Sequence, residues 1–343
     1  MESLKKLRIA LDAMGGDYAP EREVAGAVQA IRQSNGSFEI VLVGNEIAVR
    51  KELAKHQVDG LPISIVHASQ VITMEDSPTA ALKQKKDSSL AVGMHLHRNG
   101  NADAFVSAGN TGAVLSAATL ILGRIKGVSR PMIGTFMPAV HGTFFLVDAG
   151  ANVDCRAQHL YEFAVMGSLY FELVLKKNKP TVALLNVGEE KSKGTEVVLG
   201  AYKLLSESSL NFIGNVEGRD ILKPKADVVV CDGFVGNIVL KFGEGIPPFL
   251  KGRLRLFADR GIFKKLVTGI TSWPLKAALW DLNPNEQGGV PVLGVNGVAI
   301  IGHGSSTSKG IKNMILAAAN VAASKVNQHI EIALAHSNSA AKG

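Results

Sequence analysis

Residues 143–147 read Thr143-Phe144-Phe145-Leu146-Val147, an apolar run that leads into the loop Asp148-Ala149-Gly150-Ala151-Asn152-Val153-Asp154. A helical pattern follows this loop through Leu175. The same order of strand, glycine loop and helix recurs along the chain. Such alternation is typical of α/β folds, in which helices cover both faces of a mostly parallel sheet. The sequence therefore predicts a three-layer α/β/α architecture.

Six further apolar runs have the length and composition of strands. They are Arg8–Leu11, Phe38–Val43, Ala104–Ser107, Thr181–Leu185, Val228–Cys231 and Val298–Ile301. Ligands of open α/β sheets bind beyond the carboxyl ends of the strands. We therefore expect the loops after these strands to meet at one edge of the sheet. No linker or composition shift divides the chain, which predicts a single catalytic domain over residues 1–343.

Composition and charge narrow the classes of protein. Hydrophobic residues make up 46% and charged residues 20%, which excludes a wholly disordered chain. With 37 basic and 30 acidic residues the net charge is +7, which favours acidic partners. Cys155 and Cys231 cannot form a disulfide framework, so we expect a reducing compartment and two buried thiols. The N-terminal residues show no signal peptide, and the expected location is the cytoplasm.

One segment, residues 246–282, breaks the pattern and is predicted to be a helical hairpin inserted in the domain. It holds seven basic and two acidic residues, and apolar stripes at helical spacing run along it. Either the stripes pack into the core or a dimer interface, or the hairpin protrudes as a surface for an acidic protein or an anionic membrane. No array of stacking aromatics accompanies the charge, so nucleic acid is not expected. The basic residues proposed for this surface are Lys251, Arg253, Arg255, Arg260, Lys264 and Lys265.

The glycine loops are candidates for phosphate binding. A loop that opens a helix presents free backbone N–H groups and the positive end of a dipole, and nearby hydroxyls and amides add donors. Each glycine could instead make only a tight turn, and each polar residue only cap a helix. The candidate residues are Gly109, Asn110, Thr111 and Gly112 in one loop and Gly304, Ser305 and Ser306 in another.

Familiar cofactor and nucleophile motifs are missing from the sequence. There is no GxxxxGK[ST], no complete GxGxxG, no HExxH and no GxSxG. We therefore expect no cofactor and no metal. Asp148 and Asp232 each follow a strand, where an acid is more often a helix cap or loop brace than a catalyst. Pro20 precedes the predicted helix Glu21–Arg32, whose early acids suit its positive end.

Six loop motifs together resemble the bacterial phosphate acyltransferase family of phospholipid synthesis. The resemblance runs from about Arg8 to Val326. The motifs are Asp12-Ala13-Met14-Gly15-Gly16-Asp17, Ser107-Ala108-Gly109-Asn110-Thr111-Gly112-Ala113, Asp148-Ala149-Gly150-Ala151-Asn152-Val153-Asp154, Asn186-Val187-Gly188-Glu189-Glu190 with Lys193-Gly194, Gly214-Asn215-Val216-Glu217-Gly218, and Asp232-Gly233-Phe234-Val235-Gly236-Asn237.

This resemblance implies a reaction, a fold and partners. Inorganic phosphate would attack the thioester of a long-chain acyl group on acyl carrier protein, giving acyl phosphate for phosphatidic acid synthesis. The fold would be related to those of isopropylmalate dehydrogenase and phosphotransacetylase. The family also implies a homodimer at the inner face of the cell membrane, whose product feeds a membrane glycerol-3-phosphate acyltransferase.

Site roles can be assigned as hypotheses. Asn110, Thr111, Ser305 and Ser306 would hold phosphate oxygens, since phosphate dianion is itself nucleophilic and needs positioning rather than an activated protein nucleophile. The remaining candidates are Lys191 or Lys193 for charge neutralisation, His303 as a proton donor to sulfur or a loop brace, and Asp232 and Asn237 for orientation. Two rival functions remain: a dehydrogenase of the related fold, and a non-catalytic scaffold joining carrier protein to membrane.

Overall fold

Eleven strands form one mixed sheet in the computed structural model, which describes residues 6–223, 225–278, 286 and 288–340. Their order across the sheet is β3-β2-β1-β4-β11-β10-β5-β6-β9-β7-β8. The strands are β1 (Leu7–Asp12), β2 (Phe38–Gly44), β3 (Ile63–His67), β4 (Ala104–Ser107), β5 (Met132–Pro138), β6 (Thr143–Val147), β7 (Thr181–Asn186), β8 (Asn211–Glu217), β9 (Val228–Val230), β10 (Val290–Leu293) and β11 (Ala299–Ile301).

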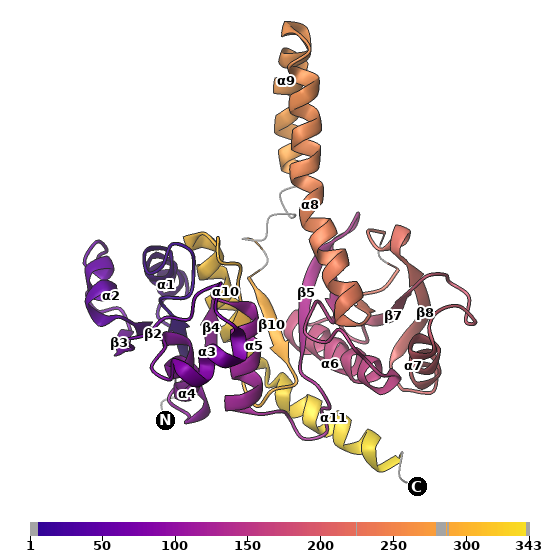
Figure 1. The fold of residues 1–343 in the computed structure, drawn as a ribbon, viewed down its shortest axis with the longest axis horizontal. Coiled ribbons are helices and arrows are strands. Elements are labelled where there is room, and N and C mark those ends of the chain that lie inside the picture. The colour runs from indigo at the N-terminus through magenta and orange to yellow at the C-terminus, as the bar shows by residue number, and fades with distance from the viewer. Residues whose placement is uncertain (1–5, 224, 279–285, 287, 341–343) are drawn as a thin grey trace.

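Helices lie on both faces of this sheet, which confirms the predicted α/β/α fold (Figure 1). A short π-helical turn (Ala118–Leu122) continues α5, and a 3₁₀ turn (Gly218–Asp220) follows β8. The helices are α1 (Glu21–Gln33), α2 (Glu46–Leu53), α3 (Pro78–Gln84), α4 (Ser89–Arg98), α5 (Thr111–Ala117), α6 (Ala157–Leu175), α7 (Glu196–Ser206), α8 (Gly233–Ala258), α9 (Ile262–Ala278), α10 (Ser308–Ser324) and α11 (Val326–Ala340).

Strand direction corrects one prediction. β3, β2, β1, β4 and β11 are mutually parallel, and so are β6, β9, β7 and β8. Between these halves, β10 is antiparallel to both β11 and β5, and β5 is antiparallel to β6. Three successive reversals leave the two halves pointing in opposite directions. The loops after β1, β4 and β11 therefore leave one edge, and those after β6, β7 and β9 leave the other, so the expectation of a single edge was wrong.

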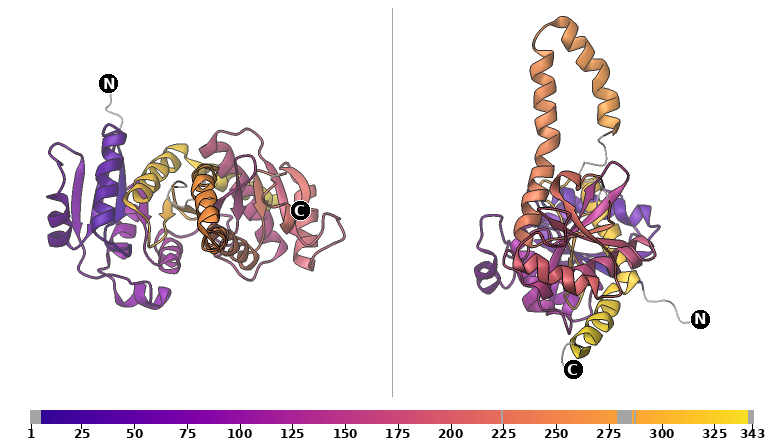
Figure 2. Two further views of the ribbon diagram at one scale, coloured as in Figure 1. Left: turned by 90° about the horizontal axis from the view of Figure 1, so that it is seen from above. Right: turned by 90° about the vertical axis from the view of Figure 1, so that its right-hand side faces the viewer.

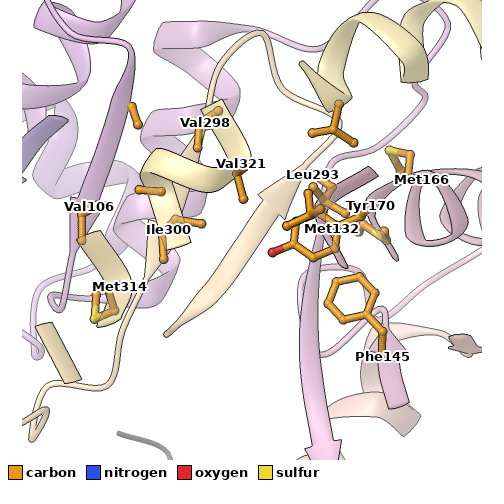
Figure 3. Close-up of a cluster of buried hydrophobic side chains, with 14 of the residues drawn as sticks. Val106, Met132, Phe145, Met166, Tyr170, Leu293, Val298, Ile300, Met314 and Val321 are labelled. Atoms are coloured by element: carbon orange, nitrogen blue, oxygen red, sulfur yellow. The ribbon is translucent and has the colours of Figure 1, made fainter. Parts of the chain in front are cut away.

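The core continues across the junction between the halves. Figure 3 shows its apolar side chains, with Met314, Ile300 and Val298 on one side and Tyr170 and Phe145 on the other. The Phe145 and Tyr170 rings stack with centroids 4.9 Å apart. Gly134 on β5 is required here, because a Cβ at this position would lie 2.1 Å from Cζ of Phe145. Close packing thus fixes β5 against β6 and α6.

The predicted helical hairpin protrudes from the body, as Figure 1 and the right-hand view of Figure 2 show. α8 begins at Gly233, so its first turns lie against the body before the shaft of the hairpin emerges. Pro247 and Pro248 lie inside α8 and lack the N–H groups that would bond the carbonyls of Gly243 and Glu244. Residues 279–282 of the predicted hairpin lie outside the described residues. Among the described helices, none is long and apolar enough to span a membrane.

Candidate active site

A pocket of about 1030 Å³ lies between the two halves of the molecule. This volume matches the upper range of pockets that bind small molecules. Side chains of β5, the ends of β10 and β11, and helix α8 line it. Six of the predicted site residues contribute to its wall, namely Gly109, Thr111, Asn237, His303, Gly304 and Ser306.

The loops after β1, β4 and β11 build the polar end of the pocket. The half of the molecule that contains these strands is called the N-terminal half, although β11 comes late in the chain, and the half that contains β6, β7, β8 and β9 is called the C-terminal half. The backbone N–H of Asp17 donates to the carbonyl of Gly304 at 2.9 Å, which joins the loops after β1 and β11. Ser107 connects the loops after β1 and β4, because its hydroxyl donates to Asp12 Oδ2 at 2.8 Å and accepts from the N–H of Gly109 at 3.0 Å. A Cβ at Gly304 would lie 2.5 Å from Asp17 Oδ1, so a larger residue here would have to displace the Asp17 side chain.

Asn110 is a brace in the structure, although it was predicted to bind phosphate. Its Nδ2 donates to the carbonyls of Thr73, Met74 and Asp76 at 3.1–3.2 Å. Its Oδ1 accepts from the N–H of Ala113 at 3.1 Å and caps α5. The side chain is 9% exposed and is not part of the pocket wall. These bonds engage the amide within the chain and give it a structural role, and its contact with phosphate remains a prediction.

Neighbouring residues of the same loop behave differently. Gly109 and Thr111 line the pocket, and Thr111 is the first residue of α5. Gly112 lies away from the wall, where a Cβ would come 2.7 Å from Cγ of Pro78. The close approach of α3 to α5 therefore explains why glycine occupies position 112.

The loop after β11 places His303, Gly304 and Ser306 in the pocket wall. Ser305 is exposed and outside the wall. Its hydroxyl lies 2.8 Å from His303 Nδ1, and its N–H donates to the same nitrogen at 3.3 Å. The bracing contact that sequence reasoning left open for His303 is thus present, and the ring still reaches the pocket.

Asp232 caps α8, because its Oδ1 accepts from the N–H of Val235 at 2.8 Å. One turn later, Asn237 reaches the pocket and contacts the loop after β6, where a Cβ at Gly150 would lie 3.4 Å from Asn237 Cβ. Asp232 is not part of the pocket wall. The cap and the contact with Gly150 fit the orienting roles predicted for the two residues, which remain predictions.

Asp148 gathers the loop after β6 around a fully buried carboxylate. Oδ1 accepts from the N–H groups of Ile133, Gly150 and Ala151 at 3.0–3.2 Å. Oδ2 accepts from the N–H and the side-chain amide of Asn152 at 2.7 and 2.9 Å. Burial raises the pKa of Asp148, and these donors oppose that rise. The carboxylate thus shapes the loop that carries Ala149 and Gly150 into the pocket wall.

Lys191 and Lys193 lie in the loop after β7, and both side chains are exposed. β9 and β6 separate β7 from β5, and neither lysine is part of the pocket wall. Within this chain the structure does not bring them to the other candidates. Their catalytic role remains a prediction.

Glu23 is a buried acid that the sequence reasoning did not identify as a site residue. It is 1% exposed, and burial raises its pKa to about 7, with Asp12 and Asp17 adding to the rise. Gly16 lies directly against the carboxyl group, since a Cβ there would be 2.2 Å from Glu23 Oε1. The acid thus supports the loop that joins Gly304. Its place in the first turn of a helix after Pro20 suggested only an acid that suits the positive end of the helix dipole.

The two cysteines are buried and free, as predicted. Burial raises the pKa of the Cys155 thiol to about 11 and also raises that of Cys231, so neither forms a thiolate readily. Within the described part of the chain, no three His, Cys, Asp or Glu side chains gather as a metal site.

The hairpin carries exposed apolar and basic side chains together. Phe249, Ile262 and Phe263 are 65%, 91% and 78% exposed, which excludes packing of these residues into the core of this chain. Lys264 lies over the ring of Phe257, with Nζ 5.6 Å from its centroid. The other basic residues predicted for this surface are exposed, namely Lys251, Arg253, Arg255, Arg260 and Lys265.

Solved structures with the same fold include phosphotransacetylases. One from Streptococcus pyogenes matches with a TM-score of 0.60 at 18% identity, covering 93% of this chain and 94% of that one. A EutD phosphotransacetylase from Staphylococcus aureus matches with a TM-score of 0.58 at 17% identity, covering 93% and 95%. These likenesses define the fold class as phosphotransacetylase-like.

Sequence comparison identifies the family. The model of the fatty acid synthesis protein family matches residues 7–329, and the chain belongs to that family. A phosphate acyltransferase from Chlorobaculum parvum is 45% identical over 94% of this chain and 98% of its own length. Another, from Pelotomaculum thermopropionicum, is 48% identical over 90% of each. The chain is therefore an acyltransferase.

Proposed function

We propose that this acyltransferase moves a long-chain fatty acyl group from acyl carrier protein to inorganic phosphate, giving acyl phosphate for phosphatidic acid synthesis. The observation that carries the proposal is a single pocket in which the glycine loops of Gly109 and Gly304 adjoin an apolar wall. Membership of the fatty acid synthesis family and the names of the relatives support it.

The chemistry needs positioning and charge stabilisation. A phosphate oxygen attacks the thioester carbonyl, the C–O bond forms, the C–S bond breaks, and the departing sulfur takes a proton. Thr111 and Ser306 offer hydroxyl donors for phosphate oxygens at the pocket wall. Backbone N–H groups of the same loops offer donors for the oxyanion. His303 also lines the wall, and in this proposal it gives the proton to sulfur.

Lys191 and Lys193 need a separate explanation in this scheme. Their loop lies outside the pocket wall of this chain. Charge neutralisation by either lysine therefore requires that their loop approach the site, and a second copy in the proposed homodimer is one source of such an approach. Lys193 is the residue to replace first, with assembly measured beside turnover.

The hairpin is proposed as the surface for acyl carrier protein and the anionic membrane. Its cations suit an acidic carrier protein and anionic head groups, while the exposed Ile262, Phe263 and Leu266 suit an apolar or lipid surface. We propose accordingly that the enzyme acts in the cytoplasm at the inner face of the membrane, where its product feeds a glycerol-3-phosphate acyltransferase.

The test is a trapping assay on the full chain. Purified protein is mixed with palmitoyl-acyl carrier protein and inorganic phosphate, and acyl phosphate is trapped with hydroxylamine. We expect hydroxamate that depends on phosphate, together with release of free carrier protein, and no hydroxamate when sulfate replaces phosphate. Carrier protein that binds without turnover would favour the scaffold function instead. A dehydrogenase would show binding of a nicotinamide dinucleotide.

A further inference from the structure

Apolar side chains line the pocket where α8 and β5 form its wall, and several of them are only partly buried. Met137 is buried on β5, whereas Leu222 is 39% exposed and Leu240 and Ile246 are partly buried on α8. All four line the same pocket as Thr111 and Ser306. Phosphate alone would gain no free energy from contact with such a wall. An apolar part of a ligand would, because its removal from water is favourable.

Gly243 lies on α8 opposite Met137 of β5, and both residues line this wall. A Cβ at this position would lie 2.8 Å from Cε of Met137. The nearest atom is the free end of a flexible side chain, so a larger residue at 243 can fit only by displacing Met137 and narrowing the pocket. Gly245 is two residues further along the same helix, and a Cβ there meets no heavy atom within 4 Å.

We propose that the wall formed by Met137, Leu222, Leu240, Gly243 and Ile246 is the subsite for the aliphatic chain of the acyl substrate, and that Gly243 limits the chain length accepted. The occupant follows from continuity, since one pocket joins this wall to the loops proposed to hold phosphate. The thioester carbonyl then lies near Thr111 and Ser306, and the chain extends along α8 toward the base of the hairpin. This inference rests on the proposed acyl transfer.

The Lys241–Glu244 ion pair marks the polar border of the subsite. Lys241 Nζ lies 2.8 Å from Glu244 Oε2, both side chains are exposed, and both residues contribute to the pocket wall. The charged pair thus flanks the apolar strip on the same helix. An unbranched acyl chain that lies in the strip can avoid contact with these charges.

The experiment compares Gly243→Leu with Gly245→Leu in the full chain. Both replacements improve helix propensity by a similar amount, so they are matched in that respect. Phosphate-dependent kcat/KM is measured with octanoyl- and palmitoyl-acyl carrier protein. We expect Gly243→Leu to lower the palmitoyl-to-octanoyl ratio about tenfold, as expected if roughly two methylene groups lose their contacts. Gly245→Leu should leave the ratio at the wild-type value.

Binding of palmitate and octanoate, measured by calorimetry, separates this inference from the proposed reaction. If wild-type protein makes no acyl phosphate, the proposed reaction fails. The subsite then stands if Gly243→Leu weakens palmitate binding selectively, and falls if it does not. If turnover occurs but both glycine variants keep the wild-type chain-length ratio, the subsite is wrong. Gly243→Ala, a smaller change, serves as the test variant if Gly243→Leu does not fold, and the same selective loss is required of it.

Discussion

The two halves of the sheet use similar glycine loops in different ways. In the N-terminal half, hydroxyl and backbone groups join three loops, and Thr111 and Ser306 reach the pocket wall. In the C-terminal half, one buried carboxylate, Asp148, gathers the N–H groups of its own loop and of β5. The first arrangement leaves donors at the pocket wall, where we propose that phosphate binds, and the second uses donors to shape the wall. Loops of one sequence pattern can therefore be binding loops or supporting loops.

Asp148→Ala should produce the largest effect, because it leaves several buried N–H groups without their acceptor. Each orphaned donor costs about 1–3 kcal/mol, so we expect a loss of about 4 kcal/mol or more in the free energy of unfolding. Urea titration followed by circular dichroism measures this. Asp232→Ala is the matched control, because it removes a single cap bond and should cost about 1 kcal/mol. Equal losses in the two variants would show that the Asp148 network does not stabilise this half.

Glu23→Gln tests the support beneath the N-terminal loops through pH. The pKa of Glu23 is raised from 4.5 to about 7, so between these values the folded state binds the proton that the unfolded state has lost. Wild-type stability therefore falls as pH rises through this window. The glutamine variant lacks this dependence. At about 1.4 kcal/mol per pKa unit, its stability relative to wild type should rise by about 3 kcal/mol between pH 4.5 and pH 8.

Urea titrations of both proteins across this range give the comparison. Glu21→Gln serves as the control, because Glu21 lies in the same turn and is exposed. A difference between wild type and Glu23→Gln that does not change with pH would mean that Glu23 is ionised within the folded protein at neutral pH. The support for Gly16 would then be an ionised carboxylate.

Local patterns predicted most strands well but could not supply their directions. Thr143–Val147 and Ala104–Ser107 were predicted with the bounds that the structure has. β5 and β10 were not predicted, and these are the strands whose reversals place the loops of the two halves at opposite edges. Direction depends on which strands pair, and pairing is a tertiary property that a local pattern does not contain.

The site was predictable where side-chain type and loop position were sufficient. Thr111, His303 and Ser306 do line one pocket. Asn110 did not follow the pattern, because its partners lie in residues 73–76, which no local pattern connects to it. Glu23 was not identified because its burial depends on packing against the loop that carries Gly16. Long-range contacts thus decided which polar residues brace the loops and which line the pocket.

The adjacent serines of the loop after β11 give the smallest and sharpest test of the distinction between binding and support. Ser306 lines the pocket, whereas Ser305 is exposed and contacts His303. Loss of a hydrogen bond to a charged group costs about 1.5 kcal/mol or more, so Ser306→Ala should lower kcat/KM for phosphate about tenfold. Ser305→Ala should stay within about threefold of wild type, because the backbone N–H of residue 305 still bonds His303. The hydroxamate assay at varied phosphate concentration measures both. A larger loss of kcat/KM for Ser305→Ala than for Ser306→Ala would contradict this prediction. It would mean that the position of the His303 ring matters more to turnover than the hydroxyl at the pocket wall. The division between binding and supporting residues in this loop would then be reversed.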